Sequence, residues 1–169
     1  SMDVEALLDH MSLSDVDLVG YSMGARTAVR LLIRGFRPGK LVMGGIGDTG
    51  ATTIGNRMAF FEDSLLKGEQ SANPAAGKRM AAMLAAQGLS PLSMLKVLKS
   101  QLPVDPAALG TIPTPILIIN GAQDEDNGSP EGLAKLFPHA EAKRVQGDHL
   151  TAIGDPALGD LTCGFLGAG

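Results

Sequence analysis

The chain has 169 residues, 44% of them hydrophobic and 19% charged, which is typical of one compact domain with a buried core. Its 14 Lys and Arg against 18 Asp and Glu give a formal net charge of -4 without a basic run, so we expect no nucleic-acid partner. One cysteine excludes an internal disulfide, and three scattered histidines make a metal site improbable. We expect no cofactor. No apolar run approaches the roughly 20 residues of a membrane span.

Helix and strand patterns alternate at the start of the chain. Apolar residues at helical spacing predict a helix over residues 4–11, and Val16–Val19 is predicted to be a short strand that ends at Gly20. The period becomes helical again in an apolar stripe over Ala25–Ile33, and a second strand is predicted over Leu41–Met43. This alternation is typical of a βαβ unit.

A different composition follows, rich in Met, Ala and Gly. Breakers divide this segment into three predicted helices, at about Thr53–Leu66, Pro74–Gln87 and Pro91–Gln101. We predict that residues 50–110 are a helical insertion.

Strand and helix patterns return after the insertion. The continuous apolar run Ile116–Ile119 is typical of a strand buried on both faces of a parallel sheet. A helix over Pro130–Phe137, a strand over Glu141–Val145 and a last helix that begins at the capping pair Asp155–Pro156 follow. We therefore predict an α/β fold with a parallel sheet, divided into sheet core 1–49, insertion 50–110 and sheet core 111–169.

The pentapeptide Gly20–Gly24, G-Y-S-M-G, lies between the first predicted strand and the helix that follows it. In a glycine-rich chain the pattern G-x-S-x-G is weak alone, and a strand-to-helix turn with an incidental serine is the alternative. The strand before it and the helix after it are, however, the setting that a nucleophile elbow needs. Small residues two positions to either side of the serine let strand and helix approach each other. We predict that Ser22 is a nucleophile.

A serine nucleophile needs a base and a carboxylate that orients the base. Asp124 follows the buried strand in N-G-A-Q-D, and His149 follows the next strand in G-D-H-L. Both positions fall at the carboxyl edge of the parallel sheet, where ligands of open α/β folds bind. Asp124 has Glu125 and Asp126 beside it, so a solvated acidic loop is the alternative for this carboxylate. We expect the other two histidines, His10 and His139, at the surface.

The motifs GYSMG, NGAQD and GDHL, in the order Ser, Asp, His, resemble those of α/β-hydrolase fold serine hydrolases of the esterase and lipase type. The resemblance covers essentially the whole chain. It implies strands five to eight of a mostly parallel sheet, at Val16–Val19, Leu41–Met43, Pro115–Asn120 and Glu141–Val145. It further implies that the insertion is a cap that covers the active site, and that the backbone N–H of Met23 is one donor of an oxyanion hole.

Only 21 residues precede Ser22, fewer than the family usually has. The resemblance therefore implies that strands one to four are missing, together with the loop that donates the second oxyanion-hole N–H. The first sheet strand would then be an exposed edge. We expect the chain to form a homodimer through this edge, or to associate with the missing N-terminal part.

The resemblance implies hydrolysis of a small-molecule carboxylic ester or related acyl substrate. Ser22 would attack the acyl carbon, His149 would move its proton, and Asp124 would hold the imidazole tautomer. Lactones, thioesters and C–C bonds remain open as substrates, and a catalytically incomplete fragment that serves as an assembly or scaffold module is the alternative. Tyr21, Met58 and Phe61 are predicted substrate contacts, although packing of the insertion's helices explains the last two more simply. We expect a cytoplasmic protein without membrane association.

Overall fold

The computed structural model describes residues 2–53, 57–125 and 127–167, and the chain forms two compact units. The first, here called the sheet unit, combines Ser1–Thr52 with Val104–Gly169, and the second, the helical unit, is Thr53–Pro103. Val104 and Leu109, which we predicted to belong to the insertion, are buried in the core of the sheet unit.

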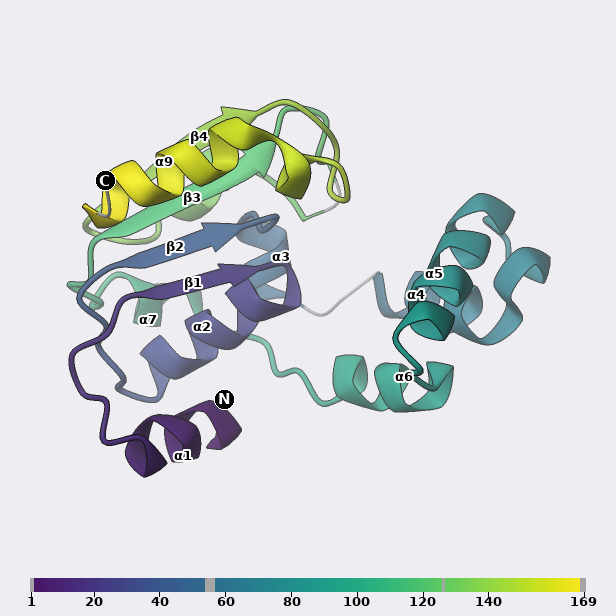
Figure 1. Cartoon of the computed structure of the whole chain (residues 1–169), viewed down its shortest axis with the longest axis horizontal. Coiled ribbons are helices and arrows are strands. Elements are labelled where there is room, and N and C mark those ends of the chain that lie inside the picture. The colour runs from purple at the N-terminus through teal and green to yellow at the C-terminus, as the bar shows by residue number, and fades with distance from the viewer. Residues whose placement is uncertain (1, 54–56, 126, 168–169) are drawn as a thin grey trace. The chain divides into compact units, whose positions relative to one another are not determined.

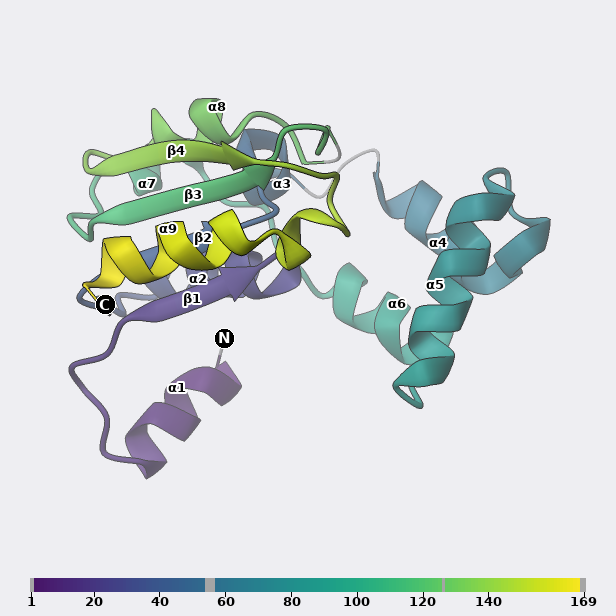
Figure 2. The same ribbon diagram turned by 45° about the horizontal axis from the view of Figure 1, so that its top comes forward.

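The sheet unit is built on a four-stranded parallel sheet in the order β1-β2-β3-β4 (Figures 1 and 2). Its strands are β1 (Leu18–Tyr21), β2 (Leu41–Gly44), β3 (Ile116–Gly121) and β4 (Ala140–Val145). The predicted α/β class with a parallel sheet is therefore confirmed. The first strand begins at Leu18, two residues later than predicted, and the Asp17 side chain just before it accepts a hydrogen bond from the Lys40 backbone N–H at 2.6 Å.

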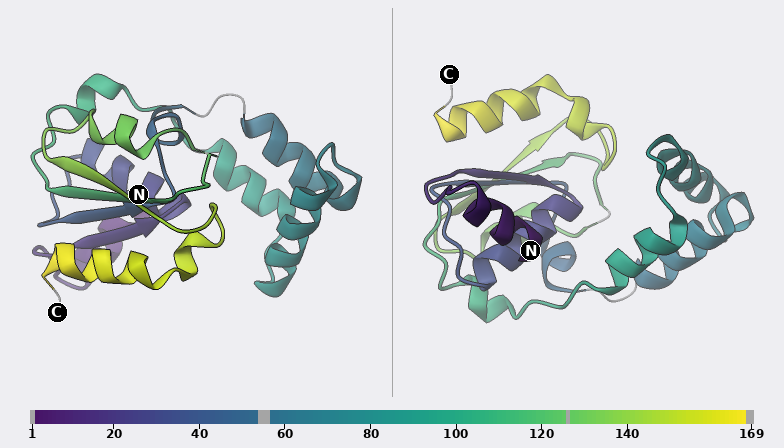
Figure 3. Two further views of the ribbon diagram at one scale, coloured as in Figure 1. Left: turned by 90° about the horizontal axis from the view of Figure 1, so that it is seen from above. Right: turned by 60° about the horizontal axis from the view of Figure 1, so that its bottom comes forward.

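Helices cover both faces of the sheet (Figure 3). The helical segments of the sheet unit are α2 (Met23–Ile33), α3 (Asp48–Thr52), α7 (Pro106–Leu109), α8 (Pro130–Ala134), the 3-10 turn η2 (Ala152–Gly154), α9 (Pro156–Leu166) and α1 (Met2–His10), of which α1 has no buried residue. Because side chains alternate along a strand, Ile116 and Ile118 of β3 face the core under α2 and α8, while Leu117 and Ile119 face α9. Burial of each such side chain contributes roughly 1.5–3 kcal/mol. This two-sided core explains the continuous apolar run of β3.

The helical unit contains α4 (Arg57–Lys67), the 3-10 turn η1 (Gly68–Gln70), α5 (Pro74–Ala86) and α6 (Pro91–Lys99). Its core is small, with Leu65, Leu84 and Leu95 buried. Residues 54–56 of the predicted helix over Thr53–Leu66 lie outside the described residues. Within the described ranges no single helix is long and apolar enough to cross a membrane, although α5 and α6, bent by 105°, pass that test together on length and composition.

The first strand is the outermost strand of the described sheet, and apolar side chains around it are exposed. Val19 is 58% exposed, and α1, all of whose residues are described, has no buried residue. Leu7 and Met11 are both more than half exposed. Self-association through β1 stays a prediction, for which these exposed groups are the physical motive.

Light scattering at micromolar concentration tests this prediction. We expect a mass of twice 17.4 kDa for the wild type and a shift toward monomer for Val19→Lys, since a charge beside the edge strand opposes pairing. A stable monomer of the wild type would refute it.

Candidate active site

Ser22 occupies the turn between β1 and α2, and its backbone is strained. Its φ of 52° and ψ of -107° place a residue other than glycine in a rarely populated region, at a cost of about 1–3 kcal/mol. A Cβ on Gly20 would lie 2.6 Å from the carbonyl carbon of Gly24, so strand and helix approach too closely there for a side chain. Apart from its chain neighbours and the backbone of its own helix, no heavy atom of the described residues comes within 4 Å of a Cβ on Gly24. The predicted need for small residues on both sides of the serine thus holds for Gly20 alone.

Met23 is the first residue of α2. The N–H groups in the first turn of a helix have no partner within the helix and carry the positive end of its dipole. The Met23 backbone N–H is therefore placed beside Ser22 as an available donor to a developing negative charge.

Asp124 and His149 lie on loops that follow the neighbouring strands β3 and β4. The Gln123 side chain accepts a hydrogen bond from the Gly147 backbone N–H at 2.9 Å and links the two loops. The Asp148 side chain stabilises the turn at His149. It accepts hydrogen bonds from the backbone N–H groups of Leu150, at 3.0 Å, and Thr151, at 2.9 Å. Adjacent parallel strands thus bring the two side chains to one edge of the sheet.

The three predicted catalytic side chains meet in a continuous hydrogen-bonded series. The Ser22 Oγ lies 2.9 Å from the Nε2 of His149, and the Nδ1 of His149 lies 2.9 Å from the Oδ2 of Asp124. The Asp124 side chain is fully buried and that of His149 is 17% exposed, so the carboxylate is not a solvated loop residue. With the Nδ1 proton donated to Asp124, the Nε2 is left to accept the serine proton.

Tyr21 contacts this series through its hydroxyl, which donates to the backbone carbonyl of His149 at 2.9 Å. Burial, and secondarily the negative charges of Asp124 and Asp148, raise the pKa of Tyr21 to about 12. The hydroxyl therefore remains a donor at all ordinary pH values and holds the main chain of His149. Its predicted role as a substrate contact stays a prediction.

The other predicted substrate contacts, Met58 and Phe61, lie in the helical unit. Both are partly buried and pack against its three-leucine core. Their predicted role as substrate contacts stays a prediction. Of the alternative residues, Glu125 and the two further histidines His10 and His139 are exposed, and Asp126 lies outside the described residues.

Asn127 is a site residue that the sequence analysis missed. Its Nδ2 donates to the carbonyl of Gly45 at 3.0 Å and lies 3.2 Å from the Nδ1 of His149. Nothing in the local pattern distinguishes this side chain from the acidic loop around it. Its proximity to Asp124 in sequence was the one available signal.

The loop that carries Asp124 is anchored where it enters α8. Ser129 caps that helix by accepting from the Gly132 N–H at 3.0 Å, and its own N–H donates to Asp48 at 2.9 Å. Two hydrogen bonds of 2.7 and 2.8 Å from Arg144 to Glu131 fasten α8 to β4. These bonds lower the pKa of Glu131 to about 2, so the link stays charged above that pH. These bonds hold the end of the loop at α8, and the Gln123 bond to Gly147 holds it near β3.

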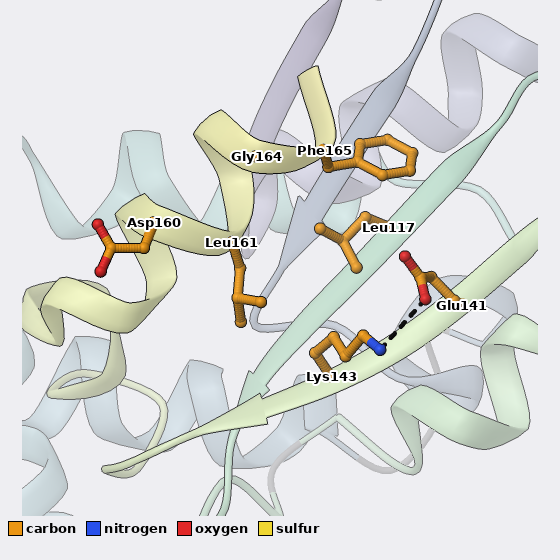
Figure 4. A pocket seen from close by; sticks show the side chains of 7 residues that line it. All are labelled: Leu117, Glu141, Lys143, Asp160, Leu161, Gly164 and Phe165. Atoms are coloured by element: carbon orange, nitrogen blue, oxygen red, sulfur yellow. Dashed lines mark ion pairs between the residues drawn. The ribbon is translucent and has the colours of Figure 1, made fainter. Parts of the chain in front are cut away.

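A cavity of about 430 Å³ lies elsewhere in the sheet unit (Figure 4). It is lined by Leu117, Glu141, Lys143, Asp160, Leu161, Gly164 and Phe165. Leu117 and Glu141 stand near the amino ends of their strands, whereas ligands of parallel sheets bind at the carboxyl ends. The Glu141–Lys143 ion pair of 3.3 Å also neutralises the charge along one wall. We assign no function to this cavity. Within the described residues no group of three His, Cys, Asp or Glu side chains could hold a metal.

Comparisons with known proteins concern the family and the fold of the chain. Residues 2–158 match the model of the alpha/beta hydrolase family. No curated protein is similar enough in sequence to match the chain.

Several solved structures share the fold. MGS-M2, an alpha/beta hydrolase enzyme from a Medee basin deep-sea metagenome library, has a TM-score of 0.74 at 18% identity over 97% of this chain and 69% of that one. A hydrolase from Pseudomonas aeruginosa has a TM-score of 0.72 at 23% identity, over 99% and 70%. The esterase EaEST from Exiguobacterium antarcticum has a TM-score of 0.70 at 14% identity, over 95% and 69%. The predicted resemblance is confirmed.

Proposed function

The chain belongs to the alpha/beta hydrolase family, and from this membership we propose that it hydrolyses carboxylic esters through Ser22, His149 and Asp124. The observation that carries the proposal is the pair of 2.9 Å contacts that the two ring nitrogens of His149 make with the other two side chains. A serine hydroxyl is a weak nucleophile, and a neutral imidazole at hydrogen-bonding distance is what activates it. The esterase among the similar structures supports an ester as substrate.

In the proposed acylation step the Ser22 oxygen attacks the acyl carbon while the Nε2 of His149 takes the hydroxyl proton. The Met23 backbone N–H donates to the oxyanion of the tetrahedral intermediate. The intermediate collapses, the ester C–O bond breaks, and His149 returns the proton to the leaving alcohol. Asp124 stays ionised and stabilises the imidazolium that forms between these transfers.

Deacylation repeats the same steps with water. His149 takes a proton from the water that attacks the acyl-enzyme, the bond to Ser22 breaks, and the proton returns to the serine oxygen. The products are a carboxylic acid and the free enzyme. Lactones and thioesters follow the same course, and Tyr21, Met58 and Phe61 remain proposed contacts for the acyl part of the substrate.

Turnover of p-nitrophenyl acetate and p-nitrophenyl butyrate tests the proposal. We expect wild type to release p-nitrophenol above the buffer rate and Ser22→Ala to fall to that rate, because the alanine side chain has no oxygen to acylate. The control is Ser14→Ala, an exposed serine, which should retain the wild-type rate.

A folded wild type whose rate equals that of buffer would favour the second candidate, an assembly or scaffold module. The exposed Val19 and the unburied α1 are the observations in favour of that candidate. A thioester and a lactone in the same assay show which acyl bond is preferred.

A further inference from the structure

Two asparagine side chains hold the two polar atoms of one peptide group. The Nδ2 of Asn127 donates to the Gly45 carbonyl at 3.0 Å, and the Oδ1 of Asn120 accepts from the Ile46 N–H at 3.1 Å. Because that carbonyl and that N–H belong to the same peptide unit, the two contacts together fix its plane. Both side chains are more than nine-tenths buried. We call this arrangement the amide clamp.

The clamped peptide forms a wall against the ring of His149. Gly45 has a φ of +62°, and a Cβ there would lie 3.1 Å from the Cε1 of His149 and 2.8 Å from the Cε1 of Tyr21. The backbone therefore stands directly beside the imidazole, with no room for a side chain between them. A third hydrogen bond, from the Gly45 N–H to the Ile119 carbonyl at 3.1 Å, fixes this backbone segment to β3.

Asn127 also approaches His149 itself, with its Nδ2 3.2 Å from the Nδ1 of the ring. Because the Gly45 carbonyl can only accept, the amide must turn its NH₂ group toward it, and the same nitrogen then faces the ring. An NH₂ group cannot accept the Nδ1 proton. The charged Asp124 carboxylate, at 2.9 Å, is thus the acceptor that remains for that proton.

The clamp carries an energetic cost. The Nδ2 of Asn120 is buried and has no hydrogen-bond partner among the described residues. A buried donor left without a partner costs roughly 1–3 kcal/mol. Unsatisfied buried polar groups that persist in a folded protein are typical of functional sites. The Asn120 side chain therefore fits a role in function better than a role in stability.

We propose that Asn127 is a positioning residue for His149. Through the peptide that Asn120 holds from the other side, it keeps the imidazole in the plane where Nε2 faces Ser22 and Nδ1 faces Asp124. The kinetic consequence rests on the proposed esterase function, whereas the effect on the ring does not.

The test compares Asn127→Ala with wild type in two measurements. For p-nitrophenyl acetate we expect kcat to fall about 10–100-fold with KM within about twofold, because a small displacement of a catalytic group costs rate rather than binding. In nitrogen-edited NMR spectra of the histidine rings, we expect the downfield Nδ1 proton signal of His149 in wild type and its loss in the variant. The matched control is Asn73→Ala, which removes the cap of α5 in the helical unit and should leave both readouts unchanged.

The outcomes separate the two proposals. Loss of the ring signal in Asn127→Ala with an inactive wild type supports the positioning role and contradicts the esterase function. An unchanged ring signal, with or without a fall in kcat, overturns the positioning role, as does an equal effect of Asn73→Ala. If Asn127→Ala does not fold, Asn127→Ser, which keeps a short donor, is compared in the same way and should lie between wild type and complete loss of the signal.

Discussion

Replacement of His149 by alanine should lower kcat for p-nitrophenyl esters by about 10⁴–10⁶-fold, because Ser22 then has no base within hydrogen-bonding distance. KM should change little, since the imidazole acts on the proton and not on the bound acyl group. Asp124→Asn should cost about 10⁴-fold, because an amide at 2.9 Å from Nδ1 can favour the wrong tautomer. Steady-state kinetics of the purified variants measures both effects.

The matched control for this prediction is His139→Ala, which removes an exposed histidine directly before β4 and should keep the wild-type kcat. A His149→Ala variant that retains more than about a tenth of the wild-type kcat would rule out the proposed base.

Gly20→Ala should destabilise the sheet unit by about 3 kcal/mol or more. The new Cβ would lie 2.6 Å from the carbonyl carbon of Gly24 and 2.7 Å from the backbone nitrogen of Ala25, and backbone atoms cannot move aside as a flexible side chain can. Either β1 separates from α2 or the strained turn at Ser22 changes. The first outcome lowers the free energy of unfolding, and the second lowers esterase activity as well.

The paired variant Gly24→Ala has the opposite expectation, although it alters the other glycine of the same motif. Its Cβ meets none of the described residues outside its own helix and its chain neighbours, and alanine is favoured over glycine within a helix by about 1 kcal/mol. Urea unfolding followed by circular dichroism should therefore show Gly24→Ala as stable as wild type or slightly more so. Equal destabilisation by both variants would contradict the steric account of the elbow.

Much of this geometry could be predicted from the sequence because it is set by local pattern and by strand order. The apolar run of β3 indicated a two-faced strand, and a parallel sheet brings the loops after neighbouring strands to one edge. Asp124 and His149 could therefore be placed near each other before any distance was known. The cap of the last helix at Asp155 was predicted from a dipeptide and is confirmed by its hydrogen bond from the Ala157 N–H at 3.0 Å.

What the sequence could not predict depends on contacts between distant segments. Asn127 has no local signature, and Asn120 lies in the N-G-A-Q-D motif but has no role that the motif predicts. Both hold a peptide far earlier in the chain, through hydrogen bonds that span 74 and 82 residues. The hydrogen bond from the Tyr21 hydroxyl to the carbonyl of His149 also had no signal in the sequence. Such contacts are decided by side-chain packing, on which the period of hydrophobic residues carries no information.

The most direct test of the central claim, that His149 activates Ser22 as a nucleophile, is the intact mass of the protein after treatment with a fluorophosphonate probe. We expect one adduct per wild-type chain, located on Ser22 by peptide mapping, and none on Ser22→Ala under the same conditions. A wild type that stays unlabelled at high probe concentration, or an adduct on a different serine, would contradict it.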